Sequence, residues 1–218
     1  MENSIDPIIF KHPFTCMIAG PTQSGKTTLL TKFISSNQDL IYPSPMNIVY
    51  CYSRWQNGYN KIKEILPYIV FQEGLPDLDL FNSDETNLLI LDDLMSSVEK
   101  DKAIVNLFCV DSHQKNISVF FLTQNLFSQG RFSRTISLNC HYIILLNNPR
   151  DRSQIHYLAR QMYPHNSQFL IEAYNNATEN RNYGYLFLDL TQSTNNNHRV
   201  QSGVNKDEKR IIYQPKLL

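Results

Sequence analysis

The 218 residues of this chain, 42% of them hydrophobic, are enough for one α/β domain with a large core and too few for two. The formal net charge of +0 gives no general attraction for nucleic acid, so contact with DNA requires local basic loops or a ring of subunits. No apolar stretch is long enough to cross a membrane, and the polar start is unlike a signal peptide, so we expect an intracellular protein with no membrane partner. The four cysteines, none in a C-x-x-C pair, are expected to be buried reduced thiols: Cys16, Cys51, Cys109 and Cys140.

Five apolar runs alternate with helical patterns along the sequence. This alternation is typical of a mainly parallel sheet with helices on both faces. The expected strands span residues 14–19, 46–52, 87–91, 117–123 and 142–146. The expected helices between them span residues 25–35, 59–66 and 98–109. We therefore predict an α/β fold.

Two more helices and two more strands are expected in the rest of the chain. Pro164 separates the two helices, because proline and the residue before it disfavour a continuing helix. The helices are expected over residues 153–163 and 167–176, and the strands over residues 183–190 and 210–213. The polar segment 191–198 between these strands is expected to be a mobile loop.

A phosphate-binding pattern, G-x-x-x-x-G-K-[ST], joins the first expected strand to the first expected helix. Its glycines let the backbone turn so that successive N–H groups point at one anionic volume, and the helix N-terminus adds its dipole. Lys26 is expected to reach the β- and γ-phosphates, and the Thr27 hydroxyl to coordinate Mg²⁺. The residues predicted to bind nucleotide are Gly20, Pro21, Thr22, Gln23, Ser24, Gly25, Lys26, Thr27 and Thr28. Within this set, we expect Thr28 to pack or cap the helix rather than to bind phosphate.

Two carboxylates directly follow the strand expected over 87–91. At such a strand end one carboxylate can reach a metal ion while its neighbour faces a water molecule, as in a Walker B motif. Asp92 is expected to hold Mg²⁺ through its water shell, and Asp93 to orient or deprotonate the attacking water. The alternative is a solvated strand end with an Asp-Asp turn.

The strand expected over 117–123 also ends in polar residues. Parallel strands present their carboxyl ends at one edge of the sheet, which is the edge where ligands bind. Gln124 is therefore expected near the γ-phosphate, where its amide can bind the phosphate or the water and sense hydrolysis. The alternative is an ordinary amide at a strand end.

Arginines that follow these strands are candidates for a finger supplied by a neighbouring subunit. A guanidinium is planar and permanently protonated, and it neutralises transition-state charge better than an ammonium. Arg131 and Arg134 are the first candidates, and Arg150 and Arg152 compete for the same role. The alternative for each is a solvated or locally paired surface arginine.

An aromatic cluster surrounds the end of the strand expected over 46–52: Tyr50, Tyr52, Trp55 and Tyr59. Such a group can form a platform for stacking bases. Packing on the sheet, with Trp55 closing the edge of a loop, is the interpretation that we prefer.

The ordered motifs together resemble the HerA/FtsK superfamily of DNA-pumping ATPases. Within it, the chain is similar to genome-packaging ATPases of large DNA viruses and of Polinton/Maverick transposons. The motifs that carry the resemblance are GPTQSGKT (20–27), YSRWQ (52–56), LDDLM (91–95), LTQNLF (122–127) and PRD (149–151). They divide the chain into an N-terminal extension (1–11), a P-loop ATPase domain (12–190), and a polar loop with a C-terminal strand or tail (191–218).

The resemblance implies a RecA-like P-loop NTPase of the ASCE class, with an extra strand between the P-loop strand and the Walker B strand. It also implies ATP and Mg²⁺ as cofactors, a homo-oligomeric ring, and translocation of double-stranded DNA into a capsid. The implied partners are duplex DNA and a capsid or portal protein. The implied location is the host nucleus or cytoplasm, or the virion.

Two other functions remain open from the sequence. A P-loop kinase for a small molecule or nucleotide has a similar length and the same phosphate-binding loop, although the Asp92-Asp93 pair with Gln124 suits water activation better. An assembly subunit could bind ATP without useful turnover. A GTPase is disfavoured, because no N-K-x-D motif follows a strand.

Overall fold

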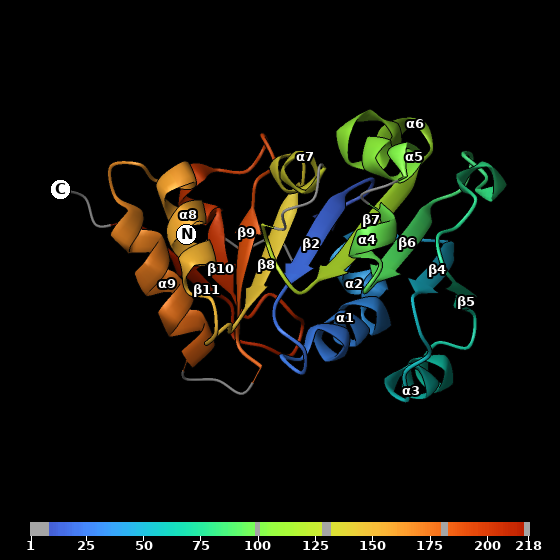
Figure 1. Cartoon of the computed structure of the whole chain (residues 1–218), viewed down its shortest axis with the longest axis horizontal. Helices are drawn as coiled ribbons and strands as arrows, with labels where there is room; N and C mark the ends of the chain where they lie inside the picture. Colours follow the sequence, from blue (N-terminus) through green and yellow to red (C-terminus); the bar gives the residue numbers. More distant parts are fainter. Residues whose placement is uncertain (1–8, 99–100, 128–131, 180–182, 216–218) are drawn as a thin grey trace, which may run out of the picture.

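The computed structural model describes residues 9–98, 101–127, 132–179 and 183–215. Within these ranges the central sheet has nine strands, in the order β11-β10-β9-β8-β2-β7-β6-β4-β5 (Figure 1). The strands are β2 (Thr15–Ala19), β4 (Asn47–Tyr52), β5 (Val70–Glu73), β6 (Asn87–Asp92), β7 (Ile117–Thr123), β8 (Tyr142–Leu146), β9 (Tyr185–Asp189), β10 (Val200–Ser202) and β11 (Ile211–Tyr213). Two further short strands, β1 (Phe10–Lys11) and β3 (Ile41–Tyr42), pair in parallel with each other.

The sheet is parallel from β8 through β2, β7, β6 and β4 to β5, whereas β9, β10 and β11 are antiparallel to their neighbours. Strand β7 lies between β2 and β6, so the strand before the phosphate-binding loop is not adjacent to the strand before the paired carboxylates. The predicted mainly parallel α/β sheet is therefore confirmed, and the sheet includes the extra strand that the resemblance implies.

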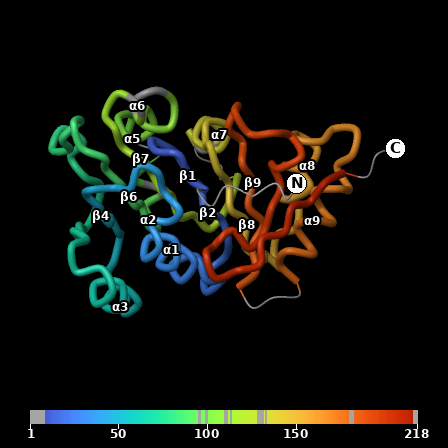
Figure 2. The backbone as a smooth tube through the Cα atoms, turned by 180° about the vertical axis from the view of Figure 1, so that it is seen from behind, coloured from blue at the N-terminus to red at the C-terminus, as the bar shows by residue number. Residues whose placement is uncertain are grey.

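The strands place alternate residues in two separate cores, one on each face of the sheet. Met17 and Ala19 belong to one core, whereas Cys16 and Ile18 belong to the other, because successive side chains of a strand point to opposite faces. Helices α1 (Lys26–Ser35), α2 (Asn37–Leu40) and α3 (Gly58–Ile65) contribute to the second core. The first core receives side chains from α4 (Met95–Val98), α5 (Lys102–Asn106), α7 (Ser133–Leu138), α8 (Ser153–Met162) and α9 (Ser167–Glu179). Helices therefore cover both faces, as Figures 1 and 2 show from opposite sides.

The prediction of a single helix over 98–109 is wrong. The chain forms α4, then α5, then a π-helical turn (Leu107–Asp111) and α6 (Ser112–Gln114). A new helix begins after Asp101 because its carboxylate accepts hydrogen bonds from the backbone N–H groups of Ala103 and Ile104, at 2.8 and 3.2 Å. Such an N-cap satisfies amide groups that have no partner within the helix.

Both ends of the described chain pack against the central domain. Phe10 is fully buried, and its ring stacks on that of Phe14 with 4.9 Å between centroids. Strands β10 and β11 continue the sheet beyond β9. The segment expected to be a mobile loop contains a 3₁₀ turn (Asn196–His198), and the Asp189 carboxylate accepts hydrogen bonds from the hydroxyls of Thr191 and Thr194.

The cysteine prediction is confirmed at three positions, because Cys16, Cys51 and Cys140 are buried. It is wrong for Cys109, which is exposed on the π-helical turn. Of the helices in the described ranges, none is long and apolar enough to span a bilayer.

Candidate nucleotide-binding site

The strand register brings the predicted site residues to one edge of the sheet. Ala19 of β2 pairs with Thr123 of β7, and Leu122 of β7 pairs with Asp92 of β6. The three strands are parallel, so they end at nearly the same level. The loops that follow them therefore start side by side.

The loop after β2 turns through two left-handed positions before α1 begins at Lys26. Gln23 has φ 65° and Gly25 has φ 97°. Gly25 is needed there for a second reason, since a Cβ atom at this position would lie 2.4 Å from a ring carbon of Tyr183. Gly25 also caps α1 with no side-chain hydrogen bond, so the first amide groups of the helix remain able to bind an anion.

Lys26 is held by its own loop. Its Nζ donates hydrogen bonds to the carbonyl oxygens of Gly20 and Pro21, at 2.6 and 3.0 Å. Burial lowers the pKa of Lys26, while the nearby carboxylates of Asp92 and Asp93 act to raise it. A phosphate that binds here would replace the two carbonyl oxygens as the partner of this ammonium group.

The two carboxylates at the end of β6, those of Asp92 and Asp93, have different environments. Asp92, the last residue of β6, is 4% exposed, and its Oδ2 accepts hydrogen bonds from the hydroxyls of Tyr50 and Tyr59 at 2.6 and 3.0 Å. Burial raises the pKa of Asp92, and the two tyrosine hydrogen bonds act to lower it. Asp93 is exposed and has φ 55°, a backbone conformation that is uncommon outside glycine and often found at functional sites.

Gln124 follows β7 directly and lies next to Asp93. Its Nε2 is 3.5 Å from Asp93 Oδ1, a long and weak hydrogen bond. Gln124 is exposed, so its amide is accessible to a ligand. The side chains that the sequence assigns to water and to the γ-phosphate are therefore neighbours.

One open cavity of about 400 Å³ collects most of the predicted residues. Its lining includes Thr22, Gln23, Gly25, Lys26, Thr27, Thr28, Asp92, Asp93 and Gln124. Thr28 is exposed at this cavity, contrary to the expectation that it packs or caps. Three predicted members do not line it: Gly20 lines a neighbouring small pocket, while Pro21 and Ser24 line neither of the two. The Ser24 hydroxyl is buried and has no hydrogen-bond partner among the residues that the structure describes.

The predicted arginines lie away from this cavity or outside the described residues. Arg131 is outside the described residues. Arg134 is exposed on α7 and Arg150 is exposed in the loop after β8. Arg152 forms an ion pair with Glu179 at 2.9 Å. Among the described residues, no arginine lines the cavity of its own chain.

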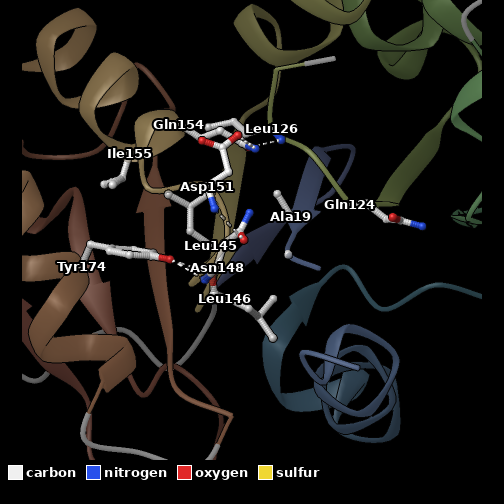
Figure 3. A pocket seen from close by; sticks show the side chains of 11 residues that line it. Ala19, Gln124, Leu126, Leu145, Leu146, Asn148, Asp151, Gln154, Ile155 and Tyr174 are labelled. Carbon is white, nitrogen blue, oxygen red and sulfur yellow. Dashed lines mark hydrogen bonds between the residues drawn. The ribbon is translucent and has the colours of Figure 1, made fainter. Parts of the chain in front are cut away.

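The polar groups that line the small pocket beside the P-loop hydrogen-bond to one another (Figure 3). Gln154 Oε1 accepts from the backbone N–H of Leu126 at 2.7 Å, and Gln154 Nε2 donates to Asp151 Oδ2 at 2.7 Å. The Tyr174 hydroxyl donates to the Leu146 carbonyl at 3.0 Å and accepts from the Asn148 N–H at 2.9 Å. The Gln154–Leu126 hydrogen bond links the segment after β8 to the loop after β7.

The donor set of the open cavity fits Mg²⁺. Magnesium prefers oxygen ligands and keeps several waters, with one or two carboxylates and the phosphates of the substrate. Thr27 and Asp92 both line the cavity and supply a hydroxyl and a carboxylate. Asp92 Oδ1 makes no hydrogen bond in the described part of the chain, so it remains available to a water of the metal's shell.

Sequence reasoning missed the polar role of two tyrosines and four further lining residues. Tyr50 and Tyr59 were expected only to pack or stack, and the aromatic cluster does pack as expected, with 5.0 Å between their ring centroids. Nothing in the sequence indicated that both hydroxyls reach Asp92. The lining also includes Gln56, Leu122, Thr123 and Tyr183. Gln56 ends the YSRWQ motif, and Leu122 and Thr123 belong to LTQNLF, but no role in the site was expected for any of the three; no motif marks Tyr183.

The fold and the site geometry together define the class of the structure. The chain has the α/β fold of P-loop ATPases, with a mostly parallel sheet and helices on both faces. No protein-family model matches the sequence, and no curated protein matches it.

The similar solved structures include B204, a viral packaging protein. The DNA-packaging ATPase B204 of Sulfolobus turreted icosahedral virus is 13% identical with a TM-score of 0.57, over 94% of this chain and 98% of that chain. The genome-packaging NTPase B204 of Sulfolobus turreted icosahedral virus 2, in complex with AMPPCP, is 14% identical with a TM-score of 0.57, over 97% of this chain and 100% of that chain. The likeness covers nearly the whole of both chains and establishes the fold.

Proposed function

We propose that this chain is a Mg²⁺-dependent ATPase of the HerA/FtsK type that moves double-stranded DNA into a capsid. The observation that carries the proposal is the single cavity lined by Lys26, Asp92, Asp93 and Gln124. The likeness to packaging proteins over nearly the whole chain supports it. As in the sequence analysis, a large DNA virus or a Polinton/Maverick element is the proposed source.

In the proposed reaction, each polar residue of the cavity has one role. Lys26 transfers its hydrogen bonds from the Gly20 and Pro21 carbonyls to the β- and γ-phosphates. Thr27 and Asp92 hold Mg²⁺, which when bound neutralises charge on the phosphate oxygens. Asp93 orients the attacking water or accepts its proton, and Gln124 binds the γ-phosphate or the water and so responds to hydrolysis.

In this proposal, a neighbouring subunit supplies the arginine finger, whose guanidinium group neutralises charge in the transition state. The reason is that no arginine from the described residues lines the cavity of its own chain. Arg134 is exposed, as the role requires, and Arg131 remains a candidate from the sequence. The ion pair of Arg152 with Glu179 makes Arg152 a weaker candidate than Arg150.

A homo-oligomeric ring also accounts for DNA binding by a chain of net charge +0. A few basic side chains repeated around a closed ring produce a strong local field in the pore. The proposed partners are duplex DNA and a capsid or portal protein. The proposed setting is the host nucleus or cytoplasm, or the virion.

The test is the rate of ATP hydrolysis with and without duplex DNA, combined with the mass of the assembled protein. We expect duplex DNA to stimulate hydrolysis, the protein to form an oligomer, and Lys26→Ala to abolish the activity. Absence of stimulation at every salt concentration tested would contradict a translocase. Transfer of phosphate to a small acceptor would indicate a kinase, and ATP binding without turnover would indicate an assembly subunit.

A further inference from the structure

Two buried tyrosines converge on a single oxygen of Asp92. Tyr50 comes from β4 and Tyr59 from α3, and the hydroxyls of both donate to Oδ2 of this carboxylate, at 2.6 and 3.0 Å. Both tyrosine side chains are fully buried, with 0% exposure. The arrangement therefore joins three elements, β4, α3 and β6, at the wall of the open cavity.

The surrounding packing holds the two hydroxyls in place. The Tyr50 ring stacks on Phe71, with 5.1 Å between centroids, and the Tyr59 ring contacts Trp55 edge-on, with 5.6 Å between centroids. Rings that pack on several sides have little rotational freedom, so each hydroxyl approaches Asp92 from a defined direction. Two donors from different elements define the plane of the carboxylate as well as its position.

The hydrogen bonds distinguish the two oxygens of Asp92. Oδ2 accepts from both phenols, whereas Oδ1 makes no hydrogen bond within the described ranges. Asp92 also lines the cavity together with Lys26 and Thr27. The tyrosines therefore occupy one oxygen of this cavity-lining carboxylate and leave the other without a hydrogen bond among the described residues.

We propose that Tyr50 and Tyr59 are positioning residues that hold Oδ2 of Asp92, so that Oδ1 is directed at the water shell of the nucleotide-bound Mg²⁺. The inference rests on the proposed function, because it takes Asp92 as the carboxylate that holds Mg²⁺. Partners that orient a metal-binding side chain commonly change metal affinity by about 10- to 100-fold when they are removed. The tyrosines thus set metal affinity without touching the nucleotide.

The test is nucleotide binding, without hydrolysis, in Tyr50→Phe, Tyr59→Phe and the double variant. Phenylalanine keeps the packed ring and removes only the hydroxyl. Binding of a fluorescent ATP analogue is titrated against Mg²⁺ concentration and repeated in excess EDTA. We expect the Mg²⁺ concentration at half-maximal binding to rise about 10-fold in the double variant, while the affinity in EDTA stays within about twofold of wild type.

Tyr142→Phe is the matched control. Tyr142 is also a buried tyrosine, and its hydroxyl accepts a hydrogen bond from the Lys11 N–H at 3.3 Å, at the start of β8 and away from the cavity. This variant should leave the Mg²⁺ midpoint unchanged. A similar shift in Tyr142→Phe would overturn the proposal, because it would show a general effect of losing a buried hydroxyl.

The proposal is overturned if the folded double variant has the wild-type Mg²⁺ midpoint, or if its affinity in EDTA falls as much as its affinity in Mg²⁺. If the double variant does not fold, the single variants decide the question, because each keeps one donor. We expect each to shift the midpoint by about threefold, and no shift in either overturns the proposal. Failure here leaves the ATPase proposal standing, whereas a wild-type protein that binds no ATP contradicts both.

Discussion

The two pockets beside the P-loop differ in how their polar groups are used. Within the described residues, the Lys26 ammonium in the open cavity hydrogen-bonds only to loop carbonyls, Asp92 has one oxygen without a hydrogen bond, and the Gln124–Asp93 contact is 3.5 Å long. In the small pocket, Gln154 and Tyr174 each make short hydrogen bonds of 2.7 to 3.0 Å to neighbouring groups (Figure 3). Gln124 lines both pockets.

This difference separates a site from a structural network. Polar groups that satisfy one another stabilise the fold and have little left for a ligand, whereas groups with unused donors or acceptors can bind one. We therefore expect substitutions in the open cavity to change chemistry more than stability. Substitutions in the small pocket should do the opposite.

The largest effect is expected for Lys26→Ala. Lys26 is the one lysine among the described residues that line the open cavity, so hydrolysis should fall about 1,000-fold and nucleotide affinity should fall with it. Lys32→Ala is the control, because Lys32 lies on the same helix, is exposed, and forms an ion pair with Glu208 at 3.4 Å. Steady-state hydrolysis and equilibrium binding check both variants. Wild-type activity in Lys26→Ala would remove the open cavity from the mechanism.

Asp93→Asn should reduce hydrolysis by about 100-fold and leave ATP binding nearly unchanged. Asparagine keeps the shape of the side chain but is a poor acceptor for a proton from water. Single-turnover hydrolysis separates this effect from binding. Asp84→Asn, at an exposed carboxylate before β6, is the control. Equal losses of binding and hydrolysis in Asp93→Asn would mean that Asp93 holds the nucleotide and does not act on the water.

Gln154→Ala should lower the free energy of unfolding by about 2 kcal/mol, because the backbone N–H of the buried Leu126 loses its partner. Nucleotide affinity should change by less than about threefold. Urea denaturation of this variant is compared with that of Gln168→Ala, an exposed glutamine on α9, which should change stability by less than about 0.5 kcal/mol. A large loss of nucleotide affinity at full stability would make the small pocket part of the site.

The smallest effect is expected for Asp92→Asn in the absence of nucleotide and Mg²⁺. Burial disfavours the charged form of Asp92 and raises its pKa, so a neutral amide should raise the free energy of unfolding by about 1 kcal/mol. Thermal unfolding in EDTA measures this gain. The same variant should lose the Mg²⁺ dependence of ATP binding. A loss of stability would assign Asp92 to the structural network.

Strong local patterns predicted much of the fold and the candidate site. Strands β7 and β8 have the predicted bounds, because their long apolar runs are buried on both faces. The sequence also predicted that the carboxyl ends of β2, β6 and β7 meet at one edge of the sheet, where the open cavity lies. The short strands β1 and β10 were missed, since so few residues carry little periodicity, whereas β11 of similar length falls within the strand expected over 210–213.

Contacts between distant segments could not be predicted. Tyr50 and Tyr59 precede Asp92 by 42 and 33 positions. The Tyr50 hydroxyl reaches Asp92 because β4 pairs with β6, and the Tyr59 hydroxyl reaches it because this α3 residue packs its ring on Tyr50. Tyr183 lies against Gly25 because β9 joins the sheet next to β8. Neither contact leaves a local pattern, since both depend on how the elements pack.

The most direct test of the account is a structure of the protein with Mg²⁺ and a non-hydrolysable ATP analogue. We predict that the terminal phosphate lies within hydrogen-bond distance of Lys26 Nζ and Gln124, with Lys26 released from the carbonyls of Gly20 and Pro21. The Asp93 carboxylate should face the γ-phosphorus from the side on which Gln124 lies. A nucleotide bound elsewhere, or a terminal phosphate turned away from Asp93 and Gln124, would contradict the account.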